Sequence, residues 1–203
     1  MKMPIFTIFV LFILALTARL HLSKRKEGRD IKEFWDRENK ANATRMKDIS
    51  NLDYISIPFD TLPLHREIED EVIQTNISVL DDLKEKKILN LTGYTNTDLK
   101  LEYGAPNITR LTEYDLNYTN LVRAISKLGQ KYIQLDLKED AIIILNYGIE
   151  INTDIRLNYE LLANIYNEDN NFEKIAYLRA KAEELNSLSK EPILRYLDKI
   201  MPV

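Results

Sequence analysis

The stretch Leu128-Gly129-Gln130-Lys131-Tyr132 decides the fold, because its pattern returns 34 positions later as Leu162-Ala163-Asn164-Ile165-Tyr166. Each copy has a large apolar residue, then a small residue, then a tyrosine one helical turn later. Further along, Gly148 returns as Ala182 at the same interval. A unit of about 34 residues is long enough for two helices and two turns. The last third of the chain is therefore predicted to consist of repeated helix pairs.

These residues resemble the tetratricopeptide repeat. In that family a large and a small residue lie on the first helix of a pair, an aromatic residue follows, and small residues lie on the second helix. Ala141 and Gly148 fill the second-helix positions of the first copy; in the second copy Ala182 matches, while Ile175 stands where a small residue is expected. The match covers about residues 120–187. The resemblance implies an all-α fold that presents a surface for a protein partner.

Small residues have a physical role in such a pair, because a large side chain at a helix crossing would hold the two helices apart. An ordinary antiparallel helical bundle with the same spacing is the alternative. The segment after the second copy supports a repeat array. Its apolar residues are spaced as on one helix face, which predicts a capping helix over the last apolar surface. These residues are Ile193, Tyr196, Leu197 and Ile200.

The N-terminal segment carries the other strong signal. Residues 4–18 contain no charge and are mostly Ile, Phe, Leu and Val. Counting to Leu22 gives about the length that crosses a hydrocarbon core, provided that Arg19 extends its charge to the interface. We therefore predict an uncleaved transmembrane anchor over residues 1–22. A cleaved signal peptide is the alternative, although Leu16 and Ala18 make a poor cleavage pair.

The charges beside this segment predict its orientation. Arg19, Arg29 and the basic run between them follow the span, whereas only Lys2 and the α-amino group precede it. Since basic residues stay on the cytoplasmic side, we predict a single-pass protein of the cell membrane with a cytoplasmic soluble domain. An exported orientation would give meaning to five N-x-Ser/Thr glycosylation motifs. They begin at Asn42, Asn76, Asn90, Asn107 and Asn117.

The whole chain is predicted to have four parts. Residues 1–22 form the anchor, and residues 23–50 form a basic, helical juxtamembrane stalk. Residues 51–116 form an irregular segment with short helices that packs on the repeats, and residues 117–203 hold the two helix pairs and the capping helix. This organisation also resembles small one-span bacterial proteins of unassigned function.

Composition argues against most kinds of chemistry. The 203 residues include no cysteine, two histidines far apart in sequence, and five glycines. Thiolate chemistry, cysteine-based zinc sites and a glycine-rich phosphate loop are therefore not expected. Basic residues outside the N-terminal cluster are mixed with acids, which argues against nucleic-acid binding. We predict no catalytic residue, metal site, cofactor or small-molecule substrate, and hence no enzyme.

The resemblance instead predicts a groove for a protein or peptide partner along the first helices of the two pairs. Asn and Gln side chains there can bond to an extended backbone through both donor and acceptor atoms. Carried onto this chain, the groove consists of Arg123, Ser126, Gln130, Glu160, Asn164 and Asn167.

The predicted function is a non-catalytic adaptor or scaffold that is tethered to the bilayer through residues 4–22 and holds a protein partner at the cytoplasmic membrane surface. One alternative is a structural subunit of a membrane complex, whose groove is filled by its own residues 51–64 and whose anchor and stalk make the contacts. The other is an exported repeat protein with a signal peptide.

Overall fold

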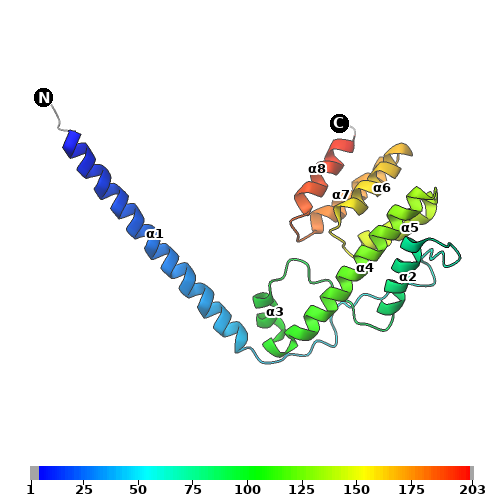
Figure 1. Cartoon of the computed structure of the whole chain (residues 1–203), viewed down its shortest axis with the longest axis horizontal. Coiled ribbons are helices and arrows are strands. Elements are labelled where there is room, and N and C mark those ends of the chain that lie inside the picture. The colour runs from blue at the N-terminus through cyan, green and yellow to red at the C-terminus, as the bar shows by residue number, and fades with distance from the viewer. Residues whose placement is uncertain (1–4, 202–203) are drawn as a thin grey trace. The chain divides into compact units, whose positions relative to one another are not determined.

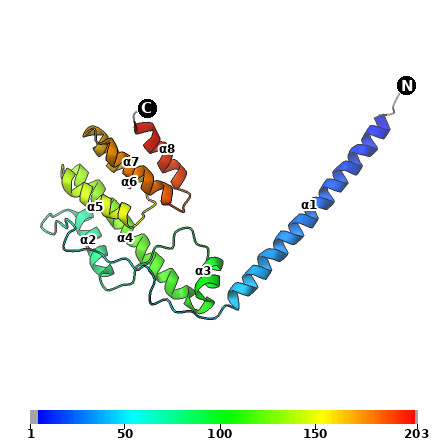
Figure 2. The same cartoon turned by 180° about the vertical axis from the view of Figure 1, so that it is seen from behind.

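The computed structural model describes residues 5–201, and in that range it contains helices and no strand, which confirms the all-α class. The chain divides into two compact units, each continuous in space but not in sequence. The first unit comprises residues 1–47 and 95–108, and the second comprises residues 48–94 and 109–203. Figures 1 and 2 show the helices of both units from opposite sides.

The first unit is built from α1 (Ile5–Asn42), α3 (Asn96–Tyr103) and a short 3-10 turn, η1 (Ala105–Asn107). Helix α3 begins with a capping box, in which Thr95 and Asp98 bond to each other's backbone N–H groups. The same Asp98 pairs with Arg37 of α1 at 2.5 Å. The amide of the buried Asn107 donates to the carbonyls of Lys47 and Tyr103, each at 2.8 Å. These bonds fix α3 and η1 to the end of α1.

The transmembrane anchor predicted over residues 1–22 is wrong. None of the helices described within residues 5–201 has an apolar stretch long enough to cross a membrane, and residues 1–4 lie outside the described range. The uncharged run ends at Ala18, short of the roughly 20 residues that a span requires. Helix α1 then continues through many charged residues to Asn42. The predicted single-pass location in the cell membrane depended on this span and is wrong as well.

The second unit holds most of the helices, and their ends recur at the interval seen in the sequence. Helix α7 begins 34 positions after α5 begins, and it ends 34 positions after α5 ends. The last residue of α6 likewise lies 34 positions after the last residue of α4. After α4, and again after α6, the chain turns through one residue in the left-handed region. These residues are Asp136 and Asn170, with φ of 59° and 54°. The helices are α2 (Glu71–Leu83), α4 (Ile108–Gln134), α5 (Lys138–Glu150), α6 (Arg156–Glu168), α7 (Phe172–Glu184) and α8 (Lys190–Ile200).

Helices α4 and α5 approach each other closely at Gly129. A Cβ atom on this residue would lie 2.4 Å from the Cγ and Cδ2 atoms of Leu145. Real side chains do not come so near, so the backbone of α4 and the Leu145 side chain together occupy the space at the crossing. One turn further along α5, a Cβ on Gly148 would lie 2.8 Å from the amide nitrogen of Asn158 in α6 and 3.2 Å from the Cγ2 atom of Ile125 in α4. Small residues therefore set the spacing of three consecutive helices.

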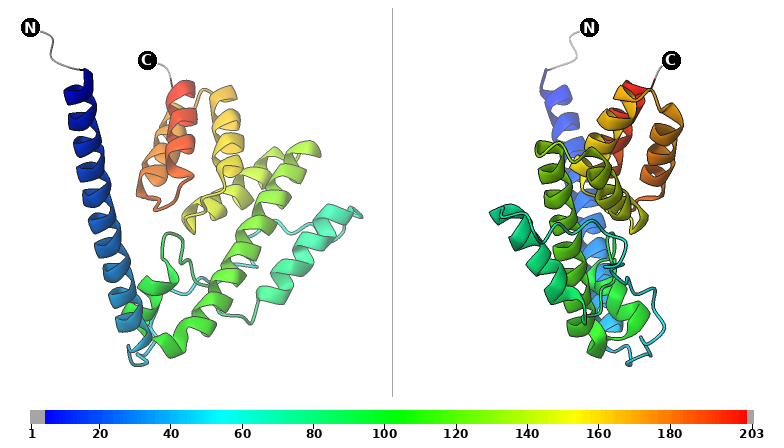
Figure 3. Two further views of the ribbon diagram at one scale, coloured as in Figure 1. Left: turned by 60° about the vertical axis from the view of Figure 1, so that its left-hand side comes forward. Right: turned by 90° about the vertical axis from the view of Figure 1, so that its right-hand side faces the viewer.

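A helix closes each end of this stack. Helix α2 shares one buried core with α4, and Asp70 caps it by accepting bonds from the N–H groups of Val72 and Ile73. Helix α8 packs against α6 and α7 and buries Ile193 and Leu197. Figure 3 shows α2 beside α4, and α8 beside α6 and α7.

Replacing Gly129 by Ala should destabilise the second unit. The added methyl group collides with Leu145, and such overpacking costs about 1–3 kcal/mol, more than the ~1 kcal/mol that alanine gains over glycine in a helix. Chemical denaturation monitored by circular dichroism measures the change. The matched control is Gly28→Ala in α1, where no atom lies within 4 Å of the new methyl group. The Gly28→Ala variant should be as stable as the parent chain or more stable. Equal losses in both variants would contradict the close crossing.

Candidate functional site

The six residues predicted to bind a partner are distributed over α4 and α6. Arg123 and Gln130 on α4, and Asn167 on α6, are exposed. Ser126 is only 6 % exposed, so it packs inside the unit rather than facing a partner. The remaining two residues lie on the half of α6 that faces the C-terminal helix.

Helix α8 engages this part of α6. The Tyr196 hydroxyl donates to the side-chain oxygen of Asn164 at 2.7 Å. The Arg156 guanidinium lies over the Tyr196 ring, 5.9 Å from its centre, and also pairs with Glu160 at 2.5 Å. Asn164 and Glu160 therefore already have partners within the chain, whereas Arg123 has none among the described residues.

Arg123 lines a cavity of about 350 Å³ between α2 and α4, which we call the α2–α4 cavity. The side chains around it come from both helices and from the turn that follows α2. Its lining consists of Asn76, Val79, Asp82, Leu83, Lys86, Asn120, Arg123, Ala124 and Lys127.

The charges in the α2–α4 cavity are unbalanced. The lining includes three cationic side chains, Lys86, Arg123 and Lys127, and one carboxylate, Asp82. None of the three cations has an ion-pair partner within the described part of the chain. Lys127 lies one helical turn after Arg123, a spacing that was readable from the sequence. Lys86 comes from the other wall, and no sequence signal connects it with α4.

A second cavity, of about 490 Å³, lies at the C-terminal ends of α5 and α7 and is called the repeat-end cavity. Residues 150–152 and 184–186 line it, and these two triplets are 34 positions apart. Among the lining residues are the carboxylates Asp53, Glu150 and Glu184, without a Lys, Arg or His. The recurrence of Glu150 as Glu184 is visible in the sequence, whereas the contribution of Asp53 is not.

An extended segment, residues 53–56, forms one wall of the repeat-end cavity and runs on across α5 and α4. The Tyr147 hydroxyl donates to the Ser56 carbonyl at 3.2 Å, and the Tyr132 hydroxyl donates to the Pro63 carbonyl at 2.6 Å. Leu62 is buried in the common core. The segment is thus held by both hydrogen bonds and apolar packing.

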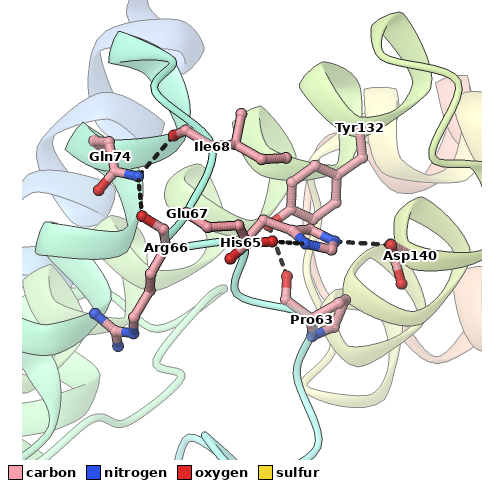
Figure 4. Close-up of polar contacts among 8 residues, drawn as sticks. All are labelled: Pro63, His65, Arg66, Glu67, Ile68, Gln74, Tyr132 and Asp140. Atoms are coloured by element: carbon pink, nitrogen blue, oxygen red, sulfur yellow. Dashed lines mark hydrogen bonds and ion pairs between the residues drawn. The ribbon is translucent and has the colours of Figure 1, made fainter.

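His65 fastens the end of this segment (Figure 4). Its Nδ1 atom lies 2.9 Å from a carboxylate oxygen of Glu67, and its Nε2 atom lies 2.8 Å from a carboxylate oxygen of Asp140 in α5. The imidazole ring also meets the Tyr132 ring edge-on, with 5.3 Å between ring centres. Lys131, the residue directly before Tyr132, pairs with Asp70 at 2.7 Å. These contacts tie the segment to both α4 and α5.

The surroundings of His65 favour its charged form. Only an imidazolium can donate from both ring nitrogens, and both nitrogens face carboxylates. The hydrogen bond to Glu67 raises the pKa of His65 above its ordinary value of 6.5, burial opposes this, and the bond to Asp140 raises it further. The Lys131 ammonium correspondingly lowers the pKa of Asp70.

Within residues 5–201, no group of three or more His, Asp or Glu side chains is arranged to hold a metal ion. Comparison of the chain with protein-family models, with curated proteins and with solved structures found no match.

The His65 cluster should make stability depend on pH. Folding raises the pKa of His65, so its protonation stabilises the folded state. This stabilisation is fully present below about pH 6.5 and is lost as the pH rises through the folded-state pKa of His65. We expect His65→Gln to remove this loss, measured as the free energy of unfolding between pH 6 and pH 9. His21→Gln, which leaves the cluster intact, is the control.

The ring protons of His65 supply an independent measurement by NMR, since the chain has only two histidines and one variant assigns both. A titration midpoint of His65 at or below 6.5 would contradict the doubly bonded imidazolium.

Proposed function

We propose that the second unit is a tetratricopeptide-like module for binding a protein partner, with α4–α5 and α6–α7 as its two helix pairs and α8 as its cap. The observation that carries this proposal is the equal spacing of helix ends, left-handed turns and small crossing residues at 34 positions. A coincidental bundle has no reason to repeat its turns at the interval of its sequence pattern.

The binding surface in this proposal is the exposed side of α4 and α6. Arg123, Gln130 and Asn167 lie there without a partner among the described residues, and they offer both donors and acceptors. Such side chains suit an extended peptide backbone, whose own N–H and C=O groups need partners. The module would hold its partner without catalysing a reaction.

A second candidate is a structural subunit whose repeats are occupied by their own chain. The segment that carries Ser56, Pro63 and His65 already covers parts of α4 and α5. In that case the partner would meet the first unit, where Phe34 and Trp35 of α1 are 57 % and 58 % exposed and pack edge to face on each other.

Site-specific photo-crosslinking separates the two candidates. A photoreactive amino acid is placed at Gln130, at Phe34 or, as a control, at Lys174, an exposed residue of α7. Crosslinked proteins from the native cells are identified by mass spectrometry. A partner linked from position 130 alone supports the repeat module. The same partner linked only from position 34 supports the structural subunit and contradicts the module.

Once a partner is identified, the triple variant Arg123→Ala, Gln130→Ala, Asn167→Ala should bind it at least tenfold more weakly. Truncating side chains at the centre of an interface typically costs about 2 kcal/mol or more. Isothermal titration calorimetry measures the affinity. The pair Glu173→Ala and Lys174→Ala, exposed on α7, should bind like the parent chain. Undiminished affinity of the triple variant would show that this side of α4 and α6 is not the binding surface.

A further inference from the structure

We propose that the α2–α4 cavity binds an acidic peptide segment of a protein partner, with the partner's carboxylates between Lys86, Arg123 and Lys127. The proposal rests on the proposed function as a protein-binding module, and it adds the chemistry of the bound segment and the place where it binds.

The α2–α4 cavity carries an excess of positive charge. Three cations from two walls line one small cavity. The carboxylate next to the lining, Asp81, is already bound by the guanidinium of Arg66 through two bonds of 2.7 Å and 2.8 Å. Asp82 alone therefore faces Lys86, Arg123 and Lys127. Like charges held close together repel each other, and a bound anion relieves that repulsion.

Arg123 and Lys127 differ from two other basic residues of the regular helices in having no ion-pair partner among the described residues. On the same helix, Lys131 pairs with Asp70 at 2.7 Å, and in α5 Lys138 pairs with Asp169 at 2.7 Å. No such partner exists for Arg123 or Lys127 in the described part of the chain. Their side chains are exposed and free to turn toward a ligand.

The lining of the α2–α4 cavity combines apolar and polar side chains. Val79, Leu83 and Ala124 contribute apolar surface, while Asn120 adds an amide that can donate to an oxygen. A Glu or Asp side chain matches this combination, because it has a short aliphatic stem and a planar carboxylate that an Arg guanidinium binds in bidentate fashion. The volume of about 350 Å³ lies near the lower end for ligand sites, as expected for a few side chains.

The surrounding charge disfavours a longer polyanion. The chain has a net charge of −4, and α2 itself carries Glu71, Asp81 and Asp82. A nucleic acid requires a continuous basic stripe along its phosphates, and these acids interrupt one. A short acidic segment can place its carboxylates in the cavity and leave the acidic face of α2 in solvent.

The test uses the full chain and a fluorescein-labelled peptide of ten residues in which Glu and Ala alternate, with fluorescence anisotropy as the readout. A peptide with Gln in place of Glu is the ligand control. The parent chain should bind the Glu peptide, at least tenfold more tightly than the Gln peptide, and the affinity should fall as salt is raised. The pair Arg123→Glu and Lys127→Glu should weaken binding at least tenfold.

The protein control reverses the same amount of charge elsewhere. Lys174→Glu and Lys199→Glu are exposed on α7 and α8 and should change the affinity less than twofold. Lys86→Glu lies outside the helices and tests the other wall without risk to helix packing; it should weaken binding at least threefold. Thermal melts establish that each variant is folded. Equal losses in the cavity and control pairs would indicate unspecific attraction and overturn the proposal.

Inorganic phosphate distinguishes a general anion site from a peptide site. Millimolar phosphate should not displace the peptide, and full displacement would overturn the assignment to an acidic segment. The outcome is separable from that of the crosslinking experiment. A partner crosslinked at Gln130 with no binding of the Glu peptide leaves the module standing and removes the acidic segment. Specific binding of the Glu peptide with no partner crosslinked at Gln130 supports the acidic-peptide site and contradicts the binding surface on α4 and α6.

Discussion

The contact between Gly129 and Leu145 is the constraint on which the second unit depends. Because α4 has no side chain at this point, Leu145 lies directly on its backbone and fixes the distance and direction of α5. The position of α5 in turn presents Asp140 to His65 and Tyr147 to Ser56, and it brings Glu150 to the repeat-end cavity. A change of helix spacing at this one crossing would move all three contacts together.

Both cavities form where a non-repeating part of the chain meets the regular helices. The α2–α4 cavity needs the turn after α2, and the repeat-end cavity needs the extended wall at residues 53–56. Their charges are opposite, with cations in the first and carboxylates in the second. The regular helices contribute Arg123 and Lys127 to the first cavity and Glu150 and Glu184 to the second. The segment before α4 adds Lys86 to the first and Asp53 to the second.

Much of the helical frame could be predicted from the sequence, since periodic apolar and small residues report local geometry. The need for a small residue at position 129 was readable in this way. The burial of Ser126 was not, because spacing along one helix does not reveal which neighbours cover it. His65 and Asp140 are 75 positions apart, so their contact depends on tertiary packing. The predicted membrane span was wrong because it extended the apolar run beyond Arg19, where α1 becomes charged.

The outward side of α8 bears on how large an assembly this chain can form. Its inner face buries Ile193 and Leu197, while Glu191, Arg195, Asp198 and Lys199 are exposed. A stack of helices with a bare apolar end would accept the next copy head to tail, and such contacts generate open-ended fibres when they do not close into a ring. The charged outer side of α8 removes that template. This side of α8 therefore offers a second copy charged side chains rather than an apolar surface.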